Sequence, residues 1–99
     1  MAMEISDKKI ISTVHAYQKM MERSISKEDV MVCIKEGKII RKYEDTKPFP
    51  AYLSSGLVNN RIIHVNFAIN KEENTIVIIT AYEPNPELWD ETYSYKVKT

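Results

Sequence analysis

Residues 61–82 read RIIHVNFAINKEENTIVIITAY, and this stretch decides the fold. Apolar and polar side chains alternate along residues 61–69, and residues 75–82 are rich in β-branched side chains. Both patterns are typical of strands. The polar run at residues 71–74 predicts a turn. We therefore expect an antiparallel hairpin whose second strand is central and well covered.

Alternation divides the two strands of this hairpin into faces. The apolar face has to bury against the rest of the domain, and it contains Ile63, Val65, Phe67 and Ile69, with Val77, Ile79 and Ala81 from the second strand. The opposite face then displays His64, Asn66, Thr80 and Tyr82.

The length of the turn sets which residues face each other across the hairpin. A five-residue turn pairs Ile69 with Thr75 and places His64 opposite Thr80. A turn one residue shorter would exchange the faces of the second strand and put Ala81 beside His64. The sequence leaves both registers open.

Two further strands are predicted before this hairpin, over residues 38–43 and 51–58. The two asparagines at 59–60 tolerate the positive φ of a tight turn, so residues 51–58 should pair with the strand that follows. That pairing sets Ser55 opposite His64. The expected sheet has four antiparallel strands.

Two helices are predicted ahead of the sheet. Over residues 7–23, Ile10, Val14, Tyr17 and Met21 recur at helical spacing. These four apolar side chains indicate the buried side of the first helix.

The second helix follows after three residues. Ser26 is a good N-cap with Asp29 at N3, and Ile25 and Val30 have the spacing of a hydrophobic staple. Gly37 suits the position after the helix, where a positive φ is common. The sequence therefore predicts an α+β fold with two N-terminal helices packed on one face of the sheet.

Length and composition bound the class of protein. The 99 residues fit a single domain, with a core over about residues 7–90 and a tail over 91–99. The aromatic residues Trp89, Tyr93 and Tyr95 indicate that part of the C-terminal segment docks on the domain. The 14 Lys and Arg balance the 14 Asp and Glu, so net charge does not draw the chain to nucleic acid or membrane.

Cysteine usage and hydropathy indicate a compartment. The lone Cys33 cannot form an internal disulfide, and its apolar neighbours predict a small buried residue rather than a nucleophile. No signal peptide or membrane-spanning run is present in the sequence. We expect a cytoplasmic protein without a membrane role.

Two histidines are the candidate proton-transfer groups. His64 on a polar sheet face could exchange a proton near neutral pH, although an ordinary half-exposed strand residue is the alternative. His15 sits at the edge of the first helix's apolar side, where a boundary residue is the alternative. Arg23 could bind phosphate or satisfy the helix end. Two histidines and one cysteine lack the spacing of metal ligands, so no metal or cofactor is expected.

The motifs of this chain resemble the domain-of-unknown-function 4258 family. Residues 15–25, HAYQKMMERSI, are similar to its helix pattern H-A-x-x-R-M-x-x-R-x-I, with Lys19 in place of the first arginine. Residues 80–89, TAYEPNPELW, carry the more specific T-x-Y-E-P-x-P-E-x-W. The resemblance spans about residues 13–91.

This resemblance implies a RelE-like fold and metal-independent RNA cleavage of the toxin type. The residues it implicates are His64 and His15 as catalytic groups, with Arg23, Lys19, Tyr52, Thr80 and Tyr82 as substrate-binding groups. The implied partners are RNA and an antitoxin-like protein. The alternative is a non-catalytic module that binds protein through its sheet face or an edge strand. The sequence leaves a homo-oligomer open.

Overall fold

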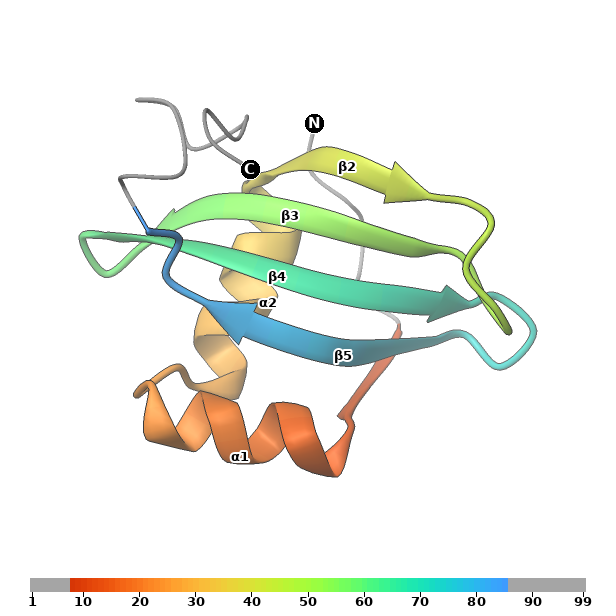
Figure 1. The fold of residues 1–99 in the computed structure, drawn as a ribbon, viewed down its shortest axis with the longest axis horizontal. Helices are drawn as coiled ribbons and strands as arrows, with labels where there is room; N and C mark the ends of the chain where they lie inside the picture. The colour runs from red at the N-terminus through yellow and green to blue at the C-terminus, as the bar shows by residue number, and fades with distance from the viewer. Residues whose placement is uncertain (1–7, 86–99) are drawn as a thin grey trace.

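The computed structural model describes residues 8–85, which form an α+β fold of two layers (Figure 1). The elements run in the order β1 (Lys9–Ser12), α1 (Val14–Glu22), α2 (Lys27–Glu36), β2 (Lys38–Tyr43), β3 (Ala51–Val58), β4 (Arg61–Asn70) and β5 (Thr75–Tyr82). The strands form one sheet in the order β1-β5-β4-β3-β2, and both helices lie on one of its faces. The expected docking of Trp89, Tyr93 and Tyr95 falls outside the described residues.

The predicted four-stranded antiparallel sheet is wrong, because a fifth strand, β1, adds a parallel pair to β5. Its residues had been assigned to the first helix. The helix instead begins at Val14, where the side chain of Thr13 caps it by accepting from the Ala16 amide at 3.0 Å. The Thr13 amide bonds to the Ile78 carbonyl at 3.2 Å, so the cap also ends β1.

The buried side of α1 also differs from the prediction. Ala16 and Met20 face the core, whereas Val14, Tyr17 and Met21 are 75%, 57% and 64% exposed. Since Ile10 belongs to β1, the predicted apolar stripe is not one helix face. Ile10 packs against the core from β1, and the three stripe residues on α1 are left at the surface.

The second helix agrees with its sequence signals. The Ser26 hydroxyl accepts from the Asp29 amide, and the Asp29 carboxylate accepts from the Ser26 amide, each at 3.0 Å. Gly37 differs from the prediction, because its φ is −79°. A Cβ there would lie 2.3 Å from the Ser55 carbonyl oxygen and 2.5 Å from that of Cys33. Glycine is therefore required by close approach of α2 to β3.

The β4–β5 hairpin begins in the register of the shorter turn and leaves it at a bulge, so neither register that the sequence left open holds throughout. Ile69 pairs with Ile76, one residue off the five-residue turn, and a bulge in β5 at Ile79 then shifts the pairing. Beyond the bulge, His64 pairs with Tyr82, so the predicted His64–Thr80 pair is wrong. Ser55 does pair with His64, as expected.

The bulge decides which side chains of β5 enter the core. Ile76, Ile78 and Ala81 are buried with the predicted β4 set, whereas Val77 and Ile79 are only partly buried. The β4 residues expected in the core, Ile63, Val65, Phe67 and Ile69, are all buried, and His64 and Ala68 on the opposite face are buried as well.

Cys33 is a buried structural residue, as predicted. Its thiol lies 3.3 Å from the Ile63 carbonyl oxygen, and the Ser54 hydroxyl donates to the Cys33 carbonyl at 2.9 Å. Burial raises the pKa of this thiol to about 11, which a hydrogen bond with Ser54 only partly offsets. The neutral thiol thus belongs to the packing between α2 and the sheet.

Candidate functional site

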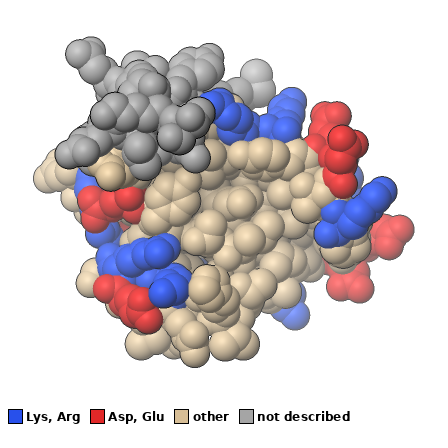
Figure 2. Space-filling view, in the orientation of Figure 1, with Lys and Arg blue, Asp and Glu red and all other residues tan. Residues whose placement is uncertain are grey.

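The sheet face turned away from the helices, called here the outer face, carries the candidate site. Strand pairing places on it His64, Asn66 and Ala68 of β4, Val77, Thr80 and Tyr82 of β5, Ala51, Leu53 and Ser55 of β3, and Lys38, Arg41 and Tyr43 of β2. Figure 2 shows this face with its charged side chains gathered at the rim. Its centre is formed by uncharged residues.

His64 and Tyr82 are cross-strand neighbours on the outer face. Their ring centroids lie 5.5 Å apart in an edge-to-face arrangement. The His64 side chain is fully buried, whereas Tyr82 is partly exposed. Burial raises the pKa of the Tyr82 hydroxyl, and the charge of a nearby Tyr43 would raise it further. Tyr82 is therefore a protonated hydroxyl at neutral pH, and it is the accessible member of the pair.

Asn66 and Thr80 form the next row of the outer face. They pair across β4 and β5, and both are partly exposed. Among the described residues, the buried Oδ1 atom of Asn66 has no hydrogen-bond partner. The predicted group of His64, Asn66, Thr80 and Tyr82 on one face is thus assembled, although in a different register.

Cationic side chains border this face on two sides. Arg23 at the end of α1 donates to the Ala81 carbonyl at 2.9 Å, which sets it beside Tyr82 along the chain. Lys19 forms an exposed pair with Glu22 at 3.4 Å. On the opposite border, β2 contributes Lys38 and Arg41. Of the two predicted phosphate-binding residues, Arg23 therefore lies at the edge of the sheet, whereas Lys19 is on α1 and contacts Glu22 of the same helix.

Arg61 joins the helix layer to the sheet, a role that the sequence did not reveal. Its guanidinium donates to the carbonyl oxygens of Arg23 at 3.3 Å and of Ser24, and to the Glu83 carboxylate at 3.0 Å. It also lies 3.5 Å from the Asp29 carboxylate. These contacts hold the turn between the helices, and hence the end of Arg23's helix, against the sheet.

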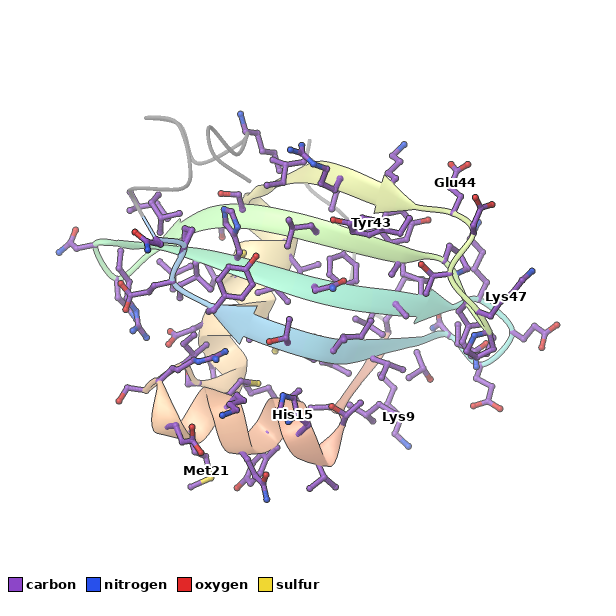
Figure 3. The ribbon with its side chains drawn as sticks, viewed as in Figure 1. Lys9, His15, Met21, Tyr43, Glu44 and Lys47 are labelled. Atoms are coloured by element: carbon purple, nitrogen blue, oxygen red, sulfur yellow. The ribbon has the colours of Figure 1, made fainter. Side chains whose placement is uncertain are left out.

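His15 and Tyr52 lie apart from the His64–Tyr82 pair. His15 is exposed on α1, below β5 in the view of Figure 3, whereas His64 is on β4. Tyr52 pairs with Phe67 and stacks on its ring with centroids 5.7 Å apart. Because Phe67 is in the core beneath the helices, Tyr52 lies on the other side of the sheet. The structure thus does not bring the two histidines together.

Tyr43 is a candidate site residue that the sequence analysis missed. It is 42% exposed on the outer face, where Figure 3 labels it at the end of β2. It ends a predicted strand and shares its face with Arg41, two residues earlier. Alternation along β2 could have placed Tyr43 on the outer face. The bulge between Ile39 and Arg41 interrupts that alternation, so the sequence alone did not show it.

Residues 8–85 contain neither a group of metal ligands nor a membrane-spanning helix. In residues 8–85, no three His, Cys, Asp or Glu side chains are grouped so that they could hold a metal ion. No helix in this part of the chain is long and apolar enough to cross a membrane.

Comparison with known proteins gives a match to one family model. Neither the curated proteins nor the solved structures contain a match to this chain. A family described as a domain of unknown function matches residues 12–83, which run from the end of β1 to just past β5. That match covers both α1 and the His64–Tyr82 pair. The chain belongs to the DUF4258 family.

Proposed function

We propose that this chain binds single-stranded RNA on its outer face and cleaves it in the manner of a small RelE-like, metal-independent ribonuclease of toxin type. The observation that carries the proposal is the uncharged centre of this face, with Tyr43 exposed and Tyr82 partly exposed on it and cations at its borders. The RelE-like likeness comes from the motifs of the sequence.

The composition of the outer face suits a single strand of RNA. Aromatic side chains stack on unpaired bases, and amide and hydroxyl groups such as those of Asn66 and Thr80 bond to base edges. Arg23 on one border and Arg41 on the other are separated by the uncharged centre of the face. With so few cations, binding should involve few phosphates and depend only modestly on salt.

In this proposal Tyr82 contacts the scissile phosphate. A water molecule takes the proton of the ribose 2′-hydroxyl as the 2′-oxygen forms a bond to phosphorus. The bond to the 5′-oxygen breaks, and protonation of that oxygen by Tyr82, which recovers its proton from solvent, leaves a cyclic phosphate and a 5′-hydroxyl. The raised pKa of Tyr82 keeps its hydroxyl protonated, so it can donate to the departing oxygen. His64, being buried against the ring, positions Tyr82, and Arg23 offsets the charge on phosphorus.

The test compares the same substitution on the two faces of the sheet. A labelled single-stranded RNA of mixed sequence is incubated with protein in EDTA, and binding and cleavage are measured separately. Tyr82→Phe should lower the cleavage rate at least tenfold with little change in binding. Tyr52→Phe, on the helix side, should leave both unchanged. His64→Gln should lower cleavage and alter its pH profile without abolishing RNA binding.

Two results would overturn the proposal. One is that wild-type protein neither binds nor cleaves any RNA offered. The other is that Tyr82→Phe and Tyr52→Phe cleave at the same rate. Equal rates at the wild-type level would indicate a contaminating nuclease, and equally lowered rates would indicate a general effect on folding.

A protein-binding module is the second candidate function. It is favoured by the apolar side chains that α1 leaves at the surface, among which Val14, Tyr17 and Met21 are each more than half exposed. Contiguous exposed apolar surface commonly marks a site of protein association. An antitoxin-like protein would be one such partner.

A further inference from the structure

An apolar groove of about 320 Å³ lies between β1, α1 and the start of α2. Ile10 and Ile11 of β1 form one wall, Tyr17 and Met21 of α1 another, and Val30 of α2 contributes to the rest. The groove is on the helix side of the sheet, at the edge farthest from β2. It is therefore separate from the outer face and from Tyr82.

The groove runs beside an edge strand whose outer backbone groups meet no described residue. In the parallel pair with β5, the amides of Lys9 and Thr13 bond to Asn74 and Ile78. Alternate residues of a strand point their N–H and C=O groups in opposite directions, so those of Ile10 and Ser12 point away from β5. Within residues 8–85, β1 is the last strand on that side of the sheet.

The positive charge of lysines at the groove favours an acidic occupant. Lys27 is the one charged residue in its lining, and Lys9 is exposed on the adjacent strand. A second copy of the chain would bring two such sets of lysines together without a carboxylate from either lining. A segment of opposite charge would instead pair with Lys27.

We propose that β1 and this groove dock an extended, acidic segment of another protein. The segment adds a strand to the outer edge of β1, inserts alternate apolar side chains beneath Tyr17 and Met21, and places a carboxylate near Lys27. Main-chain hydrogen bonds to Ile10 and Ser12 supply affinity, and the groove and the lysine supply specificity. This proposal rests on the second candidate function and is independent of RNA cleavage.

The experiment uses a defined peptide as the probe, an acetylated and fluorescently labelled octamer that alternates valine and glutamate. Its binding is followed by fluorescence anisotropy at low and moderate salt. Two matched peptides serve as controls: one replaces glutamate by lysine, and the other has N-methyl groups on alternate amides, which remove main-chain donors. The acidic peptide should bind at least tenfold more tightly than either control.

Matched variants locate the binding site. Met21→Glu on the groove wall and Lys27→Glu in its lining should each weaken binding at least tenfold. Val14→Glu, on α1 but outside the lining, and Lys35→Glu, at the other end of α2, should change it less than twofold. All four positions are exposed on helix surfaces, so folding should be retained. Hydrogen exchange should slow at the Ile10 and Ser12 amides when the peptide is added.

Several outcomes would overturn the proposal. In the first, the lysine peptide binds as tightly as the acidic peptide. In the second, Met21→Glu binds the acidic peptide as tightly as the wild-type protein does. In the third, neither the acidic peptide nor either control binds. Light scattering that shows a dimer dissociated by Met21→Glu would assign the groove to a second copy. A protein partner whose binding depends on Tyr82 and not on Met21 would leave the second candidate function standing while rejecting this edge.

Discussion

Space, rather than backbone conformation, restricts position 37 to glycine. Its φ is one that any residue adopts, but the carbonyl oxygens of Cys33 and Ser55 occupy the place of a side chain. Gly56 is a milder case, because a Cβ there would meet Cys33 atoms at 3.2 and 3.3 Å. Together the two glycines allow the end of α2 to rest directly on β3.

Gly37→Ala should therefore destabilise the protein more than Gly56→Ala. The first change forces backbone atoms apart and should lower the free energy of unfolding by about 1–3 kcal/mol or more. The second needs a displacement of only a few tenths of an ångström. Urea unfolding of both variants would measure the difference, and equal losses would contradict the close approach described for Gly37.

Because of Cys33, the free energy of unfolding should fall as the pH rises into the alkaline range. Its pKa is about 11 when folded, against 9.0 for a free thiol, so the folded state favours the proton. The stabilisation from this group is complete below pH 9 and is lost as the pH rises from 9 through 11. Cys33→Ala should remove part of the alkaline fall in the free energy of unfolding, while Tyr82 contributes its own share. Identical pH profiles for the two proteins would show that the thiol is not buried.

At the scale of elements, the bulge in β5 determines which face of that strand enters the core. Ile78 is 2% exposed beneath the helices, whereas the next residue, Ile79, is at the bulge and only partly buried. The extra residue reverses the alternation of β5 beyond the bulge, so Tyr82 lies on the same face as His64. Without the bulge, Ala81 would lie on that side instead.

Adjacent isoleucines offer a direct measurement of this register. Ile78→Ala should cost about 2–5 kcal/mol of unfolding free energy, the range for a buried isoleucine. Ile79→Ala should cost about 1 kcal/mol, the usual size for a less buried site. If urea unfolding gave the larger loss for Ile79, the register predicted from a five-residue turn would be correct and the bulge absent.

The sequence predicted an element correctly where the residues that specify it are close together in the chain. The cap and staple of α2 lie within a few residues of one another, so Ser26, Asp29 and Ile25 specified that helix correctly. β1 was missed because Ile10 fits both a strand and a helical stripe with Val14, and only pairing with the distant β5 decides between them. The bulge leaves no local signal in residues 75–82, so the His64–Tyr82 contact could not be predicted although both residues were named.

At the scale of the whole molecule, one arginine fastens the two layers together. Arg61 begins β4, yet it contacts the turn between the helices, the N-terminal turn of α2 through Asp29, and Glu83 just after β5. Asp29 is also held by the Asn59 side chain at 3.0 Å. The position of Arg23 beside the outer face therefore depends on residues that never touch that face.

Arg61→Met should loosen this attachment while keeping the length of the side chain. We expect a loss of about 1–3 kcal/mol in the free energy of unfolding, since hydrogen bonds to charged groups are involved. Lys71→Met, in the exposed turn between β4 and β5, is the matched control and should change stability by less than about 0.5 kcal/mol. Thermal and urea unfolding would both measure this; losses of the same size in the two variants would argue against a fastening role.

The two ends of the sheet differ in a way that bears on behaviour at high concentration. In an open sheet with two regular edge strands, the edge strand of one molecule can pair with the opposite edge strand of the next. Repeated pairing of this kind produces fibres. On β2 the bulge between Ile39 and Arg41 distorts the ladder, and Lys38, Arg41 and Lys42 add like charges to it. Head-to-tail polymerisation through β2 is thereby discouraged, in a chain with no net charge to keep its copies apart and with β1 as the other edge strand of residues 8–85.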